Sequence, residues 1–191
     1  MLPPLLLAIP AALLFPPLSA VLLAVGAFSM WFFRDPERTP PATGVLSPAD
    51  GTVSVVRDEG DQVRVGVYMS AVDVHVNRAP LSGTVSDVER RPGAYRPAFS
   101  KESEHNERVD VTLAREDGTE YEVSLVAGWF ARRIHPYVAP GDEVARGQRI
   151  GHIDFGSRAD VLLPADYDRE DVRVRVGESV TAGESVVAAR E

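Results

Sequence analysis

Val109–Leu125 has the sequence VDVTLAREDGTEYEVSL, and this stretch decides the fold class. Apolar and polar residues alternate in Val109–Leu113 and again in Tyr121–Leu125, as they do in strands that bury one face. Between the two runs lies Asp117-Gly118, a dipeptide typical of the tight turn that joins antiparallel strands. The stretch therefore predicts a β-hairpin.

The same pattern continues along the chain from Val45 onward, where short alternating runs are separated by Gly, Pro and Asp. Thr52–Val56 and Val63–Tyr68 are two further examples. Evidence for helix in this region is confined to Ser100–Arg108, which suits one or two helical turns or a loop. The sequence predicts a mainly β protein with a compact, barrel-like or sandwich domain.

An internal repeat supports this fold. Gly141–Ile150 aligns without gaps with Gly177–Val186, and in each copy glycines frame a tight turn around a central valine. Similar turns occur in the compact β domains that carry lipoyl or biotinyl groups. Such a carrier needs a lysine at a hairpin tip, and the single lysine, Lys101, lies outside both copies. The repeat therefore predicts the architecture of these domains and not their carrier function.

Residues 1–33 contain no Asp, Glu, Lys, Arg or His and are expected to associate with a membrane as a helical segment. A bilayer is spanned by about 20 apolar residues. Prolines, including Pro16-Pro17, divide the segment into a piece ending near Leu14 and a piece from about Leu18 to Phe33. One tilted span and a short hairpin both fit this division. A cleaved signal peptide is the alternative, but the segment lacks a positively charged start.

The rest of the chain divides into a linker and one domain. Residues 34–43 are rich in proline and charge and are predicted to form a stiff linker. Residues 44–191 are predicted to form the folded domain. With the N-terminal segment retained, the protein is expected at the cell membrane.

The composition argues against several kinds of partner and site. A net charge of −8 disfavours binding to nucleic acid through phosphate neutralisation. The chain has no cysteine, which excludes disulfides and thiolate metal sites. No two histidines have a spacing typical of a metal site, and no metal is predicted. The histidines are His75, His105, His135 and His152.

Three polar residues are candidates for chemistry, and each also has a structural interpretation. Ser157 follows Gly156 between two strand-like runs, and Asp50 precedes a glycine. Both steps are common in turns. His75 lies among alternating apolar residues, as a hydrogen-bonded core histidine would. The chain has no G-x-S-x-G elbow and no phosphate-binding glycine loop.

Six motifs taken together resemble the short, archaeal-type form of the phosphatidylserine decarboxylase family. The motifs are Trp31–Arg38, Ser47–Gly51, Asp73–Pro80, Glu104–Arg108, Ala127–Ile134 and Gly147–Arg158. The resemblance runs in order from about residue 28 to residue 191. Six separate motifs make it far more specific than any one of them.

The resemblance implies a carboxy-lyase that is made as a zymogen and generates its own cofactor. In this family the serine hydroxyl attacks the preceding carbonyl, and elimination from the resulting ester cuts the chain and leaves a pyruvoyl group. Here the cut would fall between Gly156 and Ser157 and give a heterodimer of residues 1–156 and 157–191. The pyruvoyl group from Ser157 would form a Schiff base with the substrate, with no metal and no pyridoxal phosphate.

The resemblance also implies roles for Asp50 and His75. A serine hydroxyl needs a base, and a histidine oriented by a carboxylate supplies one. Longer relatives place a second histidine three residues after the first, where this sequence has Arg78. His75 is therefore expected to serve both self-cleavage and decarboxylation, or to be helped by His135 or water.

The implied substrate is a phospholipid whose serine headgroup becomes ethanolamine, a step of phospholipid biosynthesis. Arg78, Arg132 and Arg133 are candidates for contact with the lipid phosphate, because arginine matches its geometry. The arginine and acidic bias favours an archaeal ether lipid, archaetidylserine, with phosphatidylserine close behind. Exposed strand edges make further dimerisation an expectation.

Two other functions fit the residues alone. A membrane-tethered β module that binds without chemistry predicts an intact chain of 191 residues that tolerates Ser157→Ala. A membrane-bound serine hydrolase that uses Ser157, Asp50 and His75 predicts that acylating probes label Ser157.

Overall fold

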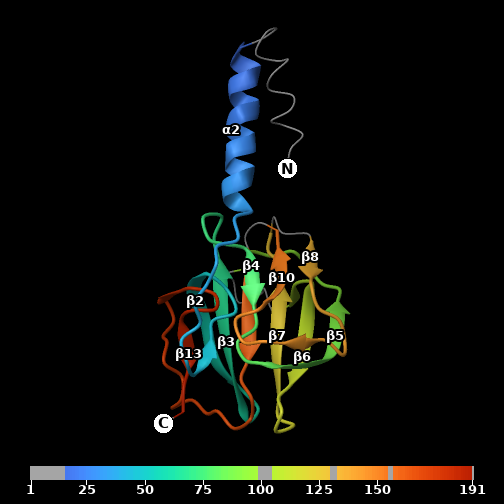
Figure 1. Cartoon of the computed structure of the whole chain (residues 1–191), viewed down its shortest axis with the longest axis vertical. Coiled ribbons are helices and arrows are strands. Elements are labelled where there is room, and N and C mark those ends of the chain that lie inside the picture. The colour runs from blue at the N-terminus through green and yellow to red at the C-terminus, as the bar shows by residue number, and fades with distance from the viewer. Residues whose placement is uncertain (1–15, 99–104, 130–132, 155–156, 191) are drawn as a thin grey trace. The chain divides into compact units, whose positions relative to one another are not determined.

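A computed structural model describes residues 16–98, 105–129, 133–154 and 157–190. The chain divides into two compact units, Met1–Pro36 and Glu37–Glu191. The first contains helix α2 (Pro16–Phe32), and the second contains the strands (Figure 1). The strands are β1 (Val45–Leu46), β2 (Gly51–Glu59), β3 (Gln62–Met69), β4 (Val76–Arg78), β5 (Gly83–Arg91), β6 (Arg108–Ala114), β7 (Glu120–Val126), β8 (Ile134–Pro136), β9 (Glu143–Val144), β10 (Arg149–Ile153), β11 (Ser157–Leu162), β12 (Ser179–Val180) and β13 (Val186–Ala188).

Helix α2 covers the second of the two predicted apolar pieces and begins at the proline pair Pro16-Pro17. Proline is accepted in the first turn of a helix but disrupts later turns. A proline pair therefore favours a helix that begins at these residues. Among the described residues no helix is long and apolar enough to cross a membrane. The predicted first piece, which ends near Leu14, lies outside the described residues.

The predicted hairpin is confirmed by β6 and β7, which pair antiparallel with Leu113 opposite Tyr121. Gly118 has a φ of 82°, in the left-handed region that favours glycine, and its N–H donates a hydrogen bond to the Arg115 carbonyl. The alternating apolar side chains Val109, Val111 and Leu113 of β6 and Tyr121, Val123 and Leu125 of β7 are buried in the core. Most of Ser100–Arg108 lies outside the described residues, and Arg108 itself begins β6.

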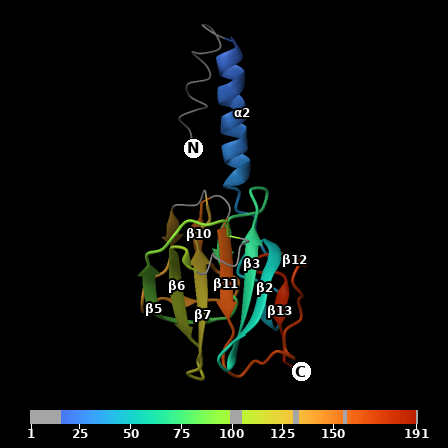
Figure 2. The same cartoon turned by 180° about the vertical axis from the view of Figure 1, so that it is seen from behind.

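The strands form one large sheet and two small ones. The eight-stranded main sheet has the order β12-β2-β3-β11-β7-β6-β5-β9 and is antiparallel throughout. A second sheet has the order β4-β10-β8, and β1 pairs with β13. Figures 1 and 2 show the main sheet curled into a half-barrel, with the second sheet over one of its faces. The prediction of a mainly β, barrel-like domain is confirmed at this level.

β11 shows how the main sheet separates an apolar face from a polar face. Its alternate residues point to opposite sides. Ala159 and Val161 belong to the hydrophobic core, and Ser157 shares their face. Arg158 and Asp160 lie on the opposite face, yet both are buried. One strand therefore contributes to the core and to a buried polar layer.

The sequence repeat is also a repeat in structure. Its turns are held by four glycines with φ between 72° and 96°: Gly141, Gly147, Gly177 and Gly183. Between Gly141 and Gly147, β9 pairs with β5, and between Gly177 and Gly183, β12 pairs with β2. The N–H of Gly147 donates to the Ala79 carbonyl, as the N–H of Gly183 donates to the Ser47 carbonyl. Two matching units therefore lie at the two ends of the main sheet.

Candidate active site

Ser157 is the first residue of β11, which lies between β3 and β7 in the middle of the main sheet. It pairs with Met69, and its side chain is completely buried. The Ser157 Oγ lies 4.0 Å from the Met69 Sδ. Gly156 lies outside the described residues, so the structure describes one side of the predicted cleavage bond. Burial keeps bulk water away from this hydroxyl.

His75 lies next to the strand that leads to the predicted cleavage bond. It directly precedes β4, which pairs with β10 so that Val76 lies opposite His152. The His75 carbonyl accepts a hydrogen bond from the Ile153 N–H at 3.3 Å. Antiparallel pairing thus brings His75 to Ile153, four residues before Ser157, although His75 and Ser157 are far apart in the sequence.

The orientation of the His75 ring follows from its hydrogen bond to the backbone. The side chain is buried, and Nδ1 lies 3.0 Å from the Asp73 carbonyl oxygen. A carbonyl can only accept, so Nδ1 carries the proton and Nε2 of the neutral ring keeps its lone pair. This is the tautomer that a general base requires.

Asp73 holds the loop that carries His75. Its Oδ2 accepts hydrogen bonds from the N–H and the hydroxyl of Ser70, at 2.7 and 2.6 Å. The Asp73 N–H in turn donates to the Ser70 carbonyl and closes a turn. An aspartate often stabilises a turn in this way, and the turn fixes the carbonyl to which His75 donates.

The Asp50 carboxylate is bound from two sides. Its Oδ2 accepts a hydrogen bond from the Arg38 guanidinium at 2.8 Å, and its Oδ1 accepts one from the Ala182 N–H at 2.7 Å. In the other copy of the repeat, the equivalent bond runs from the Arg146 N–H to the Ser82 hydroxyl at 3.0 Å. Because a serine performs the backbone contact there, the charge of Asp50 is not needed for it.

The three predicted catalytic residues are only partly brought together. His75 is hydrogen-bonded to Ile153 at the end of β10, and Ser157 begins β11 four residues later. In the part of the chain that the structure describes, no hydrogen bond joins the Asp50 carboxylate to His75 or Ser157. The role of Asp50 as the partner of His75 therefore stays a prediction.

The predicted phosphate-binding arginines differ in their surroundings. Arg78 is buried, and its guanidinium donates to the Gly147 carbonyl at 3.0 Å. Arg133 is exposed, and its carbonyl accepts from the Asp154 N–H at 3.2 Å. Arg132 lies outside the described residues. Of these arginines, Arg133 is seen at the surface beside the segment that leads to the cleavage bond.

Asn77 is a candidate site residue that the sequence did not single out. Its side chain is fully buried, and Nδ2 lies 3.4 Å from the Pro48 carbonyl and 3.6 Å from the Met69 Sδ. The Oδ1 atom has no hydrogen-bond partner among the described residues. Met69 also contacts Ser157. The side chain of Asn77, with its unsatisfied acceptor, and the side chain of Ser157 therefore contact the same methionine. A buried polar atom without a partner is costly and often marks a functional position.

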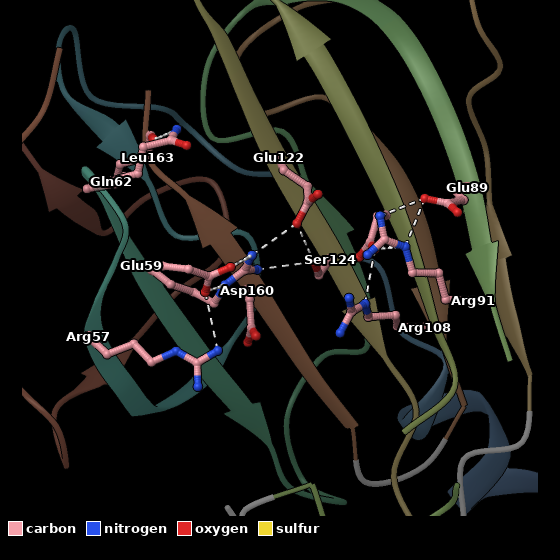
Figure 3. Close-up of polar contacts among 12 residues, drawn as sticks. Arg57, Glu59, Gln62, Glu89, Arg91, Arg108, Glu122, Ser124, Asp160 and Leu163 are labelled. Carbon is pink, nitrogen blue, oxygen red and sulfur yellow. Dashed lines mark hydrogen bonds and ion pairs between the residues drawn. The ribbon is translucent and has the colours of Figure 1, made fainter. Parts of the chain in front are cut away.

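On the opposite face of the main sheet, charged side chains form a polar layer that is buried at Arg158 and Asp160 and exposed at Glu59 and Arg91 (Figure 3). Its members include Glu59, Arg64, Arg91, Arg108, Asp110, Glu122, Ser124, Arg158 and Asp160. Arg158 binds both oxygens of Asp160, at 2.7 and 2.8 Å. A hydrogen bond from Arg64 lowers the pKa of the Glu59 carboxyl to about 2. The layer cross-links β2, β3, β11, β7 and β6 and so holds the strand that begins at Ser157.

A second polar cluster lies on the three-stranded sheet β4-β10-β8, at its β8 edge. His135 on β8 stacks on His152 of β10, and Asp154 lies near both rings. Burial lowers the pKa of His152, and the neighbouring His135 lowers it further. These two histidines are far apart in the chain, and their spacing in the sequence does not indicate a metal site. Pairing of the two strands in register is what brings them together.

Comparison with known proteins identifies the class of this fold and site. The family model described as phosphatidylserine decarboxylase matches residues 25–188. An archaetidylserine decarboxylase proenzyme of Halobacterium salinarum is 55% identical over 98% of this chain and 93% of its own length. A phosphatidylserine decarboxylase proenzyme of Streptomyces griseus is 50% identical over 84% of this chain and 73% of its own length. An archaetidylserine decarboxylase proenzyme of Methanococcoides burtonii is 44% identical over 86% of this chain and 76% of its own length.

These similarities define a carboxy-lyase of lipid metabolism. The chain belongs to the phosphatidylserine decarboxylase family. The family predicted from the six motifs is therefore confirmed, as is the prediction of an enzyme. The catalytic residues are not named by these comparisons, and their roles stay predictions.

Proposed function

We propose that this protein decarboxylates the serine headgroup of a phospholipid after cutting its own chain between Gly156 and Ser157. The proposed cofactor is a pyruvoyl group made from Ser157. Relatives named as proenzymes, at up to 55% identity, support a chain that matures by processing. The proposal rests above all on the place of Ser157, a fully buried serine that starts a central strand four residues after Ile153, whose N–H donates a hydrogen bond to the His75 carbonyl.

The surroundings of Ser157 fit a pyruvoyl group. Once the bond is cut, this group would be the first residue of β11 and would be held by the pairing with β3. The unsatisfied Oδ1 of Asn77 offers an acceptor for the amine of a serine headgroup. The pyruvoyl group supplies a ketone that captures this amine and takes up the electron pair left behind as CO2 departs.

His75 is the proposed base for self-cleavage. The Asp73 carbonyl holds the proton on Nδ1, so Nε2 can take the proton of the Ser157 hydroxyl. In turnover the same nitrogen would return a proton to the product. Asp50 would support this histidine through its negative charge, since its hydrogen bonds go to Arg38 and Ala182.

The lipid would be met at a membrane surface. Several large apolar side chains of α2 are exposed, among them Val21 at 58% and Met30 at 59%. An exposed apolar surface of this kind marks a site of interaction with a membrane or a protein. We assign it to the membrane because the substrate named for the relatives is a lipid. Arg133 is the proposed contact for the lipid phosphate.

The proposed activity can be tested with two substrates. Purified protein is incubated with vesicles that contain either archaetidylserine or phosphatidylserine, and lipid mass spectrometry follows the headgroup. We expect an ethanolamine headgroup from both lipids, with faster conversion of archaetidylserine, the lipid named for the relative at 55% identity. A protein that stays uncut on incubation and converts neither lipid would contradict the proposal.

Asp50→Ser should separate the structural role of Asp50 from its proposed catalytic role. Serine makes the equivalent backbone contact at Ser82, so the variant should fold with a melting temperature close to that of the wild type. Self-cleavage should slow by about 10²-fold, the lower end of what acid–base groups contribute. Gel electrophoresis over time measures the cut. Cleavage at the wild-type rate in a well-folded variant would show that the carboxylate is only structural.

A further inference from the structure

His135 and His152 lie directly opposite each other on neighbouring antiparallel strands. β8 and β10 pair in the register that sets His135 against His152. Their imidazole rings stack with centroids 4.5 Å apart and an angle of 11° between the ring planes. Nearly parallel rings on adjacent strands present their nitrogens side by side, and the pair can act together on one ligand.

Asp154 completes a group of three. It lies two residues beyond His152, on the same side of the strand. Its two oxygens approach different rings: Oδ1 is 3.7 Å from the Nε2 of His152, and Oδ2 is 4.0 Å from the Nε2 of His135. All three ligand atoms lie within 4.8 Å of one another.

These separations are close to those of a zinc site. With bonds of about 2.0–2.1 Å and tetrahedral angles, two ligand atoms lie about 3.4 Å apart. The observed distances of 3.7 and 4.0 Å exceed this only slightly. The ligand nitrogens of the two rings lie within 4.8 Å of each other, so the rings must turn toward each other to close the group around an ion, and the partial exposure of both side chains leaves room for this rotation.

The side chains are also held from behind, as those of metal ligands are. The Tyr137 hydroxyl lies 2.7 Å from the Nδ1 of His152. A proton on Nδ1, donated to this hydroxyl, leaves the lone pair on Nε2, the nitrogen that faces Asp154. The Asp154 N–H donates to the Arg133 carbonyl, which fixes the backbone of the third ligand.

We propose that His135, His152 and Asp154 bind a zinc ion, with water in the fourth position. Two imidazoles and one carboxylate suit zinc and its first-row neighbours, whereas Mg²⁺ and Ca²⁺ prefer oxygen ligands alone. The His135 side chain is 44% exposed, so an ion can enter from solvent. The site uses neither Ser157 nor His75 and does not depend on the proposed decarboxylase mechanism.

The test is a zinc titration of the full-length protein, purified in detergent without a histidine tag and treated with a chelator. Isothermal titration calorimetry should show one zinc ion per chain. His135→Ala and His152→Ala should each weaken binding by more than tenfold, and Tyr137→Phe by about tenfold. His105→Ala is the matched control, because His105 is exposed and lies outside the cluster, and it should bind like the wild type. Repeating the titrations in Ser157→Ala removes any effect of chain cleavage.

Cobalt provides an independent readout. Co²⁺ in the site should give the visible absorption of a low-coordinate ion with nitrogen ligands, and His152→Ala should abolish it. If an alanine variant melts below the wild type, His135→Gln replaces it, since this exposed position tolerates a polar side chain. Zinc affinity that is equal in the wild type, His135→Gln and His152→Ala would overturn the proposal, as would the absence of zinc binding to the wild type.

Discussion

Ser157→Ala should leave the chain uncut and without decarboxylase activity. Alanine has no hydroxyl to attack the preceding carbonyl and cannot become a pyruvoyl group, so the loss should be complete. The fold should survive, because the hydrogen-bond contact of the Ser157 Oγ among the described residues is a long one, 4.0 Å to the Met69 Sδ. Intact mass spectrometry of the wild type should show fragments of residues 1–156 and 157–191, and the variant should show one chain of 191 residues.

Ser86→Ala is the control for this substitution. Ser86 is an exposed serine on β5, so its loss should change neither the cut nor the conversion of lipid. The fragment of residues 157–191 from the wild type should resist N-terminal sequencing, since a pyruvoyl group has no amine. Decarboxylation by Ser157→Ala, or by a wild-type chain that remains whole, would refute the proposed cofactor.

His75→Gln should slow self-cleavage by at least 10²-fold, because it removes the proposed base. Glutamine can still donate a hydrogen bond to the Asp73 carbonyl, so the loop is expected to keep its shape. Its amide has no basic nitrogen and cannot take the proton of the Ser157 hydroxyl. The measurement is the rate at which newly made chain is converted to the two fragments.

The matched control is His105→Gln, which changes an exposed histidine and should cleave at the wild-type rate. Because His75 is buried, the melting temperature of each variant is measured beside its cleavage rate. Cleavage of His75→Gln within about twofold of the wild type, at an unchanged melting temperature, would mean that the base lies elsewhere.

The parts of the fold that could be predicted depend on neighbours in the sequence. The alternation in β6 and β7 and the Asp117-Gly118 turn are local signals, and so are the glycines of the repeat. The order of the strands is not local, since β11 lies between β3 and β7, both of which precede it by many residues. No periodicity encodes that pairing. The second apolar piece, predicted from about Leu18 to Phe33, is likewise matched by α2, because the proline pair Pro16-Pro17 is a local signal for a helix start.

The same distinction applies to the candidate site. The segments that carry Ser157 and His75 could be chosen from short motifs. Asn77 could not, because its meaning lies in an Oδ1 atom without a partner, which only three-dimensional packing reveals. The contact between His135 and His152 likewise depends on strand register. For Asp50, the pattern indicated an acid but could not show that Arg38 would be bound to it.

The place of β11 has a consequence for the lifetime of the processed protein. This strand joins β12-β2-β3 to β7-β6-β5-β9, and it would belong to the smaller of the two proposed fragments. Before the cut, the strand closes the sheet as part of one chain. After the cut, β11 and the rest of the sheet would belong to two separate molecules. Refolding from an unfolded state would then require these molecules to meet, and the effective concentration of β11 would be much lower. The mature protein would therefore be assembled once and then preserved by the height of its unfolding barrier rather than by reversible folding.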